Sequence, residues 1–251
     1  MLYYKTWVET RSRFGIGLVV LICGAAITVL YYERLLALLP QVPQLDLGAS
    51  VNKQIAESAA LIKDYRSYIW SQWFLRTFPQ TWTIFAALIG SGGLLAHGAR
   101  GALYTLSLPV SRTRLLATRA AVGLAEIFVL AMVPSLVVPL VSPAAGYSYG
   151  FGDAIVHGLL FFLSGAAYFA LAFYLSTLLA DVWRPFLIVL FVSIVDQTVR
   201  DFPSELSLFR VMSAEPYFRS GGLPWLGLVI SLGLTASLFY AAKTSIARRD
   251  F

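Results

Sequence analysis

The stretch FGIGLVVLICGAAITVLYY, residues 14–32, contains 19 residues and no charged side chain. About 20 apolar residues in a helix cross the ~30 Å core of a bilayer, so this run has the length of a transmembrane span. Lys5, Arg11 and Arg13 precede it, which makes a secretory signal peptide the alternative. The apolar core of a signal peptide is about 7–15 residues long and leads to a cleavage site of small residues. This run is longer and ends in YYER at 31–34, and we therefore interpret it as a retained span.

Five further apolar runs follow, and the fifth span is the shortest of the six. Only 10 uncharged residues separate Pro185 from Asp196, so polar residues must extend this span against protein rather than against lipid. No internal repeat interrupts the pattern, which predicts a single all-α integral membrane domain over residues 1–251. The expected spans are about residues 14–32, 80–99, 115–142, 154–180, 185–199 and 223–242.

The composition agrees with this architecture. Apolar residues make up 58% of the chain and charged residues 13%, and the mean hydropathy is +0.73. These values exclude a disordered chain and argue against a water-soluble enzyme. The chain has a single cysteine, Cys23, and its two histidines, His97 and His157, are far apart, so the sequence predicts neither a disulfide nor a metal site.

The basic residues predict the orientation of the spans. With six spans both termini lie on one side, which would hold 11 of the 19 Lys and Arg residues within 46 residues. The other side would hold 8 within 81 residues. The positive-inside rule therefore predicts a protein of the cytoplasmic membrane with both termini in the cytoplasm. The net charge of +6 is explained by this orientation, and we predict no nucleic-acid partner.

Two segments outside the spans have amphipathic character. In residues 3–13, Lys5 and Glu9 share one helical face and aromatic side chains lie on the other, which predicts an interfacial helix. A charged flank that only orients the first span is the alternative. Residues 33–79 would form an outer segment whose second half is an amphipathic helix ending in the aromatic cluster Trp70, Trp73, Phe74 and Phe78. We expect this cluster to anchor the helix at the outer interface, with a substrate gate as the alternative.

Two acids, Glu126 and Asp196, lie at membrane depth. An ionisable group inside a span is costly and is therefore a candidate functional residue. Arg119 precedes Glu126 by seven residues on the same helical face, so an ion pair with a neighbouring helix, or snorkelling toward the cytoplasm, is the structural alternative for Glu126. Asp196 is expected near the outer end of its span, where a structural role is favoured.

The sequence shows no phosphate-binding loop, no HExxH zinc motif and no GxSxG nucleophile elbow. Its most informative stretch is HGARGALYTLSLPVSRTRLL at 97–116, in which an apolar helix precedes Pro109 and a cluster of arginines. No acid occurs between residues 98 and 125. Ser111 is a suitable N-cap for the helix that follows. An apolar helix next to basic residues is suited to docking into a groove of a cytoplasmic partner.

This stretch resembles the cytoplasmic loop between the second and third spans of exporter-type ABC transporter permeases with six spans. In that family the loop commonly contains an acid, a Gly-Thr-like pair and a Leu-rich turn, followed by LxxPVSR and a further basic residue. His97 departs from the pattern, because the family often has Glu there. The amphipathic start and the closing residues 248–251, RRDF, are also similar to the family. The matching loop residues are Gly101, Leu106, Pro109, Val110, Ser111, Arg112 and Arg119.

The resemblance implies a permease subunit that is not itself an enzyme. It would pair with a second permease copy, or a related one, and with ATP-binding subunits that carry the ATP and Mg. The resemblance also implies export of an unidentified substrate by alternating access. It implies no cofactor in this chain. The short turn 181–184 would also carry motion from the ATPase. The residues implied in coupling to the ATPase are Arg100, Leu103, Leu106, Pro109, Ser111, Arg112 and Arg114.

Two other classes remain open at this point. An ion-coupled secondary transporter would use Glu126 or Asp196 for proton coupling, and its transport would persist without any ATPase. An intramembrane enzyme would need a nucleophile and base, or several metal ligands, at one depth. His97 and His157 are expected near opposite ends of their spans, which argues against the enzyme.

Overall fold

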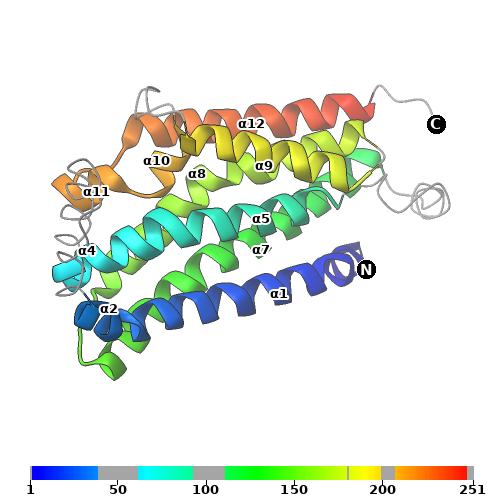
Figure 1. Ribbon diagram of the computed structural model, residues 1–251. Coiled ribbons are helices and arrows are strands. Elements are labelled where there is room, and N and C mark those ends of the chain that lie inside the picture. The colour runs from blue at the N-terminus through cyan, green and yellow to red at the C-terminus, as the bar shows by residue number, and fades with distance from the viewer. Residues whose placement is uncertain (1, 39–61, 93–110, 180, 199–206, 248–251) are drawn as a thin grey trace.

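Long apolar helices run side by side along the molecule in the computed structural model, which describes residues 2–38, 62–92, 111–179, 181–198 and 207–247 (Figure 1). Every regular element within these ranges is helical. Four helical stretches are long and apolar enough to cross a membrane. The protein is therefore a multi-pass membrane protein by helix length and hydropathy. These stretches are α1 (Leu2–Leu30), α7 (Arg112–Val141) with its extension η3 (Ser142–Ala145), α8 (Phe151–Leu178) and α12 (Trp225–Ala247).

The other two expected spans are helical over residues 80–90 and 185–198. A short α4 (Tyr65–Ile69), a π-helical stretch η2 (Trp70–Thr77) and α5 (Phe78–Gly90) follow one another without a break. The wide π turns lie directly before Pro79, which has no N–H to donate to the preceding turn. Helix α9 (Trp183–Thr198) has 16 residues and begins two residues earlier than expected. By themselves α5, with 13 residues, and α9 are short for a span.

The helices alternate in direction, so their ends gather at two ends of the bundle. We call the end at which α1 and α7 begin and α5 and α12 end the N-terminal end (Figure 1). The short helices α2 (Tyr32–Leu38), α10 (Leu208–Met212) and α11 (Glu215–Ser220) lie at the opposite end. Helix α8 is the central helix, because it packs against α5, α7, α9, α10 and α12. Gly90 allows the close approach of α5 to α8, since a Cβ there would lie 2.7 Å from the Phe169 carbonyl oxygen.

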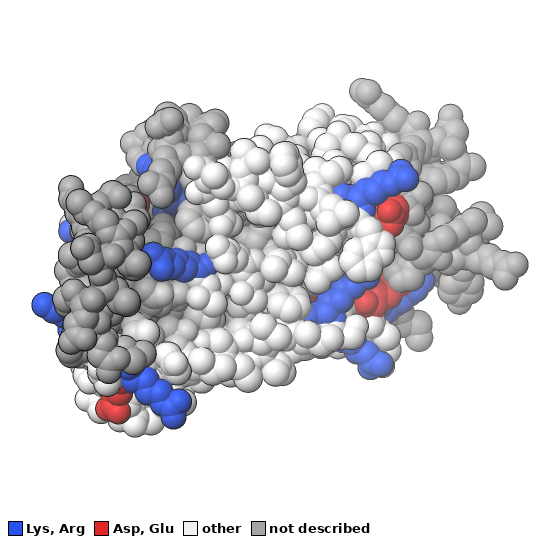
Figure 2. Space-filling model, viewed as in Figure 1, with Lys and Arg blue, Asp and Glu red and all other residues white. Residues whose placement is uncertain are grey.

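The charged side chains confirm the layout of a membrane protein. On the face shown in Figure 2 they gather toward the two ends, and the band between them is apolar. Large apolar side chains of the long helices are exposed, among them Val19 of α1, Phe191 of α9 and Val229 of α12. Such a surface is suited to lipid and not to water.

The aromatic cluster of the outer segment lies elsewhere than predicted. Trp70, Trp73, Phe74 and Phe78 are buried and belong to the main core. The Phe78 ring stacks on Phe161 of α8 with a centroid distance of 4.2 Å. The prediction of an exposed interfacial anchor is therefore wrong for these side chains, because they pack between helices. Residues 39–61 of the outer segment lie outside the described residues.

The N-terminal segment also differs from its prediction. Residues 3–13 form no separate interfacial helix, because they are the first turns of the continuous helix α1. Thr6 and Thr10 make up the buried face of these turns, while Tyr3 and Tyr4 are exposed. The segment thus extends the first span and packs against α7. Between α9 and α12, the described residues form the short helices α10 and α11.

Candidate functional site

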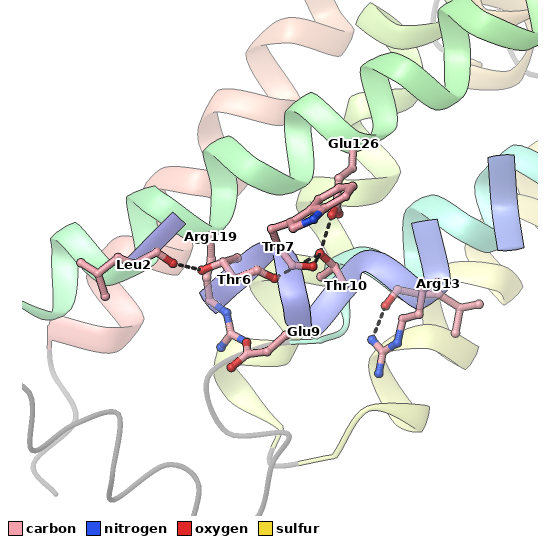
Figure 3. A network of polar contacts seen from close by, with 9 residues as sticks. Leu2, Thr6, Trp7, Glu9, Thr10, Arg13, Arg119 and Glu126 are labelled. Atoms are coloured by element: carbon pink, nitrogen blue, oxygen red, sulfur yellow. Dashed lines mark hydrogen bonds and ion pairs between the residues drawn. The ribbon is translucent and has the colours of Figure 1, made fainter. Parts of the chain in front are cut away.

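Polar side chains join α1 to α7 at the N-terminal end of the bundle (Figure 3). Arg119 and Glu126 lie on one face of α7, and Glu9 and Thr10 lie opposite them on α1. The Arg119 guanidinium forms an ion pair with the Glu9 carboxylate. The Thr10 hydroxyl donates a hydrogen bond to Glu126 Oε1 and also contacts the carbonyl oxygens of Thr6 and Trp7. We call these four residues the α1–α7 network.

The Arg119 side chain of this ion pair is buried. Arg119 is 9% exposed, so its charge is largely removed from water. A charge in such a position is tolerated only when a partner of opposite charge compensates it. For Glu126 the sequence leaves an ion pair with a neighbouring helix as the structural alternative. The ion pair on this face of α7 is instead formed by Arg119 with Glu9, and Glu126 accepts a hydrogen bond from Thr10.

Glu126 is the most deeply buried acid of the network and is 3% exposed. Its Oε2 atom has no hydrogen-bond partner in the described part of the chain. The residue borders a groove of about 440 Å³ on the outside of α1 and α7, next to the aromatic side chains of Tyr3, Trp7 and Phe14. A carboxyl group in this position can bind a proton or a cation.

Arg13 connects α1 to a second helix. Its guanidinium donates a hydrogen bond of 2.7 Å to the carbonyl oxygen of Leu88, in the last turn of α5. The Arg13 guanidinium also lies close to Gly92, because a Cβ atom added at Gly92 would be 2.9 Å from Arg13 Nη1. A cation at the C-terminus of a helix satisfies carbonyl groups that have no partner within the helix. Arg13 therefore fixes the end of α5 to α1.

Helix α1 contacts both helices that flank residues 93–110, a segment that lies outside the described residues. Helix α5 leads into this segment, and α7 follows it. The first turns of α1 hold both flanking helices. Arg13 binds the end of α5, and the α1–α7 network binds α7. A displacement of either flank must therefore move or break contacts of α1.

Three of the seven residues implied in coupling lie within the described ranges. Ser111 is the N-cap of α7, as predicted, and its hydroxyl accepts a hydrogen bond of 3.3 Å from the Arg114 backbone N–H. Arg112 is the first residue of α7. Arg114 is exposed and borders a second groove. The other four, Arg100, Leu103, Leu106 and Pro109, lie outside the described residues.

Asp196 has a different environment from Glu126. It lies near the end of α9, where its Oδ2 atom accepts hydrogen bonds from the Tyr168 hydroxyl at 2.6 Å and the Phe209 N–H at 2.8 Å. It thereby joins α9 to α8 and α10. This arrangement supports the structural role that the sequence favours.

A second polar cluster, which the sequence does not indicate, lies at the opposite end of the bundle. The Asp153 carboxylate forms an ion pair of 3.1 Å with Arg66 and accepts a hydrogen bond of 2.9 Å from the Tyr217 hydroxyl. Burial, together with the neighbouring Asp153 carboxylate, raises the pKa of the Tyr217 phenol. His157 is buried, and its Nδ1–H donates to the Asp153 carbonyl oxygen at 2.8 Å. The cluster joins α4, α8 and α11 and holds the short helices in place.

Within the described residues, no group of three or more His, Cys, Asp or Glu side chains could hold a metal ion. Comparisons with protein-family models, curated proteins and solved structures gave no match to this chain. The assignment of a function therefore rests on the residues themselves.

Proposed function

We propose that the chain is the membrane-spanning permease subunit of an ATP-driven ABC exporter. It would move a substrate across the cytoplasmic membrane by alternating access, powered by a separate ATP-binding subunit. The observation that carries this proposal is the stretch 97–119, whose sequence resembles the coupling loop of such permeases and whose flanks are both held by α1. The chain has no phosphate-binding loop of its own, so ATP and Mg would bind to the partner.

The contacts of α1 give the proposal a mechanical basis. An ATPase that moves the segment 93–110 would displace the end of α5 and the start of α7 together. Arg13 and the α1–α7 network would then transmit the displacement to the first span. Packed helices respond to such shifts as rigid bodies, which is how a small movement at one end can open a path elsewhere.

We further propose six spans with both termini in the cytoplasm. Helix α5 with its extension η2, and α9, would be the second and fifth spans. The N-terminal end of the bundle would then face the cytoplasm. A second permease copy, or a related one, would complete the transport path at the interface between the subunits.

This orientation predicts where reporters become active. A reporter fused after Phe251 should be cytoplasmic, and one inserted near Gly48 should be exported, because the Lys and Arg residues are concentrated on the side of the termini. The measurement is the activity of alkaline phosphatase and of green fluorescent protein at each position, since each reporter is active on one side only. Finding both positions on the same side would contradict the six-span topology.

An ion-coupled secondary transporter is the second candidate, and the unpartnered oxygen of Glu126 favours it. The two hydrogen bonds that Asp196 accepts from α8 and α10 support a structural role, which weighs against a proton path that uses both acids. The two candidates differ in their energy source. In inverted membrane vesicles, transport by an ABC permease stops when the ATP-binding subunit is absent and continues when the proton gradient is collapsed. A secondary transporter gives the opposite pair of results.

A further inference from the structure

A second groove lies at the N-terminal end of the bundle, between α7 and α12. It has a volume of about 600 Å³. Helix α7 contributes its side from Thr113 to Leu124, α8 contributes Phe173, and α12 contributes Phe239 and Lys243. The rings of Phe173 and Phe239 meet edge to face with a centroid distance of 5.6 Å and close the groove on its inner side.

The lining of this groove is apolar over most of its length. Small side chains of α7, among them Ala117 and Ala121, leave room beside the two phenylalanines. The distance along α7 from Arg114 to Leu124 is about 15 Å, at 1.5 Å per residue. This is half of the ~30 Å hydrocarbon core, that is, the depth of one leaflet. The groove thus has the length and polarity of a site for one acyl chain.

Two basic side chains, Arg114 and Lys243, lie where the groove meets the end of the bundle. Arg114 and Lys243 are exposed and line the groove, and neither forms an ion pair within the described residues. No described acid lines the groove either. Arg119 and Arg184 differ in this respect, since Arg119 pairs with Glu9 and Arg184 with Asp181. The positive charge at the mouth of the groove is therefore available to an anion.

We propose that this groove binds an anionic phospholipid. The phosphate lies between Arg114 and Lys243, and one acyl chain extends along Ala117 and Ala121 toward Leu124. An apolar groove with two cations at one end complements a lipid that has an anionic headgroup and apolar chains. A zwitterionic lipid carries its own ammonium group, which repels these cations. On the orientation proposed above, the site opens to the cytoplasmic leaflet, where anionic lipids attract basic side chains. The binding itself does not depend on the proposed transport function.

The test uses the full chain in phosphatidylcholine nanodiscs that contain a trace of photoactivatable lipid. The probe is phosphatidylglycerol with a diazirine near the end of one acyl chain, and the matched probe is phosphatidylcholine with the same chain. Cross-linked peptides are mapped by mass spectrometry. We expect the phosphatidylglycerol probe to label the α7 and α12 peptides that line the groove well above the phosphatidylcholine probe. Unlabelled phosphatidylglycerol should compete for this labelling.

Three variants separate the charges from the apolar groove. Replacing both cations, Arg114→Gln with Lys243→Gln, should weaken labelling of these peptides roughly 10- to 30-fold, given about fivefold for each basic residue near a lipid surface. The matched control, Arg11→Gln with Arg184→Gln, removes two positive charges outside the groove and should leave labelling unchanged. Ala121→Trp fills the groove at an exposed position and should reduce labelling by both probes.

Two outcomes would overturn the proposal. Equal labelling by the two probes, unaffected by removal of Arg114 and Lys243, would show that the groove is an ordinary lipid-facing surface. Protection of the groove peptides from both probes would show that protein covers it, either a second copy of this chain or another subunit. A folded state is confirmed for each variant by its elution as a single species in size-exclusion chromatography.

Discussion

Replacing Glu9 with Ala should destabilise the protein by about 3 kcal/mol, because it leaves the buried Arg119 guanidinium without its partner. Glu9 lies on α1 and Arg119 on α7, 110 residues away in sequence. Removal of one member of a buried ion pair leaves an uncompensated charge in a medium that solvates it poorly. The change removes an acid from the N-terminal end, so it does not weaken the positive-inside signal.

The measurement is unfolding in mixed micelles by titration with SDS, followed by tryptophan fluorescence. Glu215→Ala is the matched control, because it breaks the Glu215–Arg219 pair, in which the arginine side chain is 69% exposed. An exposed pair of this kind contributes about 0–1 kcal/mol. A double variant, Glu9→Leu with Arg119→Met, should recover most of the lost stability, since it removes both charges. If Glu9→Ala costs no more than Glu215→Ala, the ion pair does not hold α1 to α7.

Reversing the charge of Arg112, by Arg112→Glu, should abolish binding of the ATP-binding subunit. Like charges brought together in a docked contact cost several kcal/mol, which is a loss of at least about 100-fold in affinity. Leu106→Asp should have a similar effect by placing a charge in the apolar stretch 103–108 that we propose contacts the partner. Arg114 stays unchanged in this experiment, because it borders the groove between α7 and α12.

The readouts are co-purification of the ATP-binding subunit and transport in vesicles. Arg11→Glu is the matched control, since Arg11 is exposed on α1 at the same end of the bundle. It makes the same change of charge outside the loop and should retain binding. Arg100 and Arg119 remain to preserve the orientation of the spans in all variants. Binding and transport at the level of the unaltered chain in both Arg112→Glu and Leu106→Asp would show that the loop is an ordinary connection.

The helices could be predicted from the sequence because the length of an apolar run is a direct requirement of the bilayer. The run at 14–32 is helical to Leu30, and the cap at Ser111 follows from its side chain alone. The start of α1 could not be predicted in this way. Lys5 and Glu9 give residues 3–13 the pattern of a surface helix, and only the contacts with α5 and α7 explain why these turns continue the span.

The candidate site was predicted less completely, for a physical reason. Helical periodicity shows that Arg119 and Glu126 share a face of α7, but it carries no information about which helix lies opposite. The partner Glu9 comes from a distant part of the chain, and its place on the polar face of an amphipathic segment does not indicate a contact with α7. The aromatic cluster shows the same ambiguity, because Trp and Phe suit both a membrane interface and a helical core. Because Trp73 and Phe74 are buried, they belong to the helical core.

The proposal of an ABC permease is tested most directly by purification with and without an ATP-binding subunit, beginning with the product of the neighbouring reading frame. Alone, the chain should show no ATP hydrolysis. Expressed together, the two proteins should co-purify in a 1:1 ratio, and ATP hydrolysis should appear only in the complex. Hydrolysis of ATP by the isolated chain, or transport that persists without any ATP-binding subunit, would contradict the account.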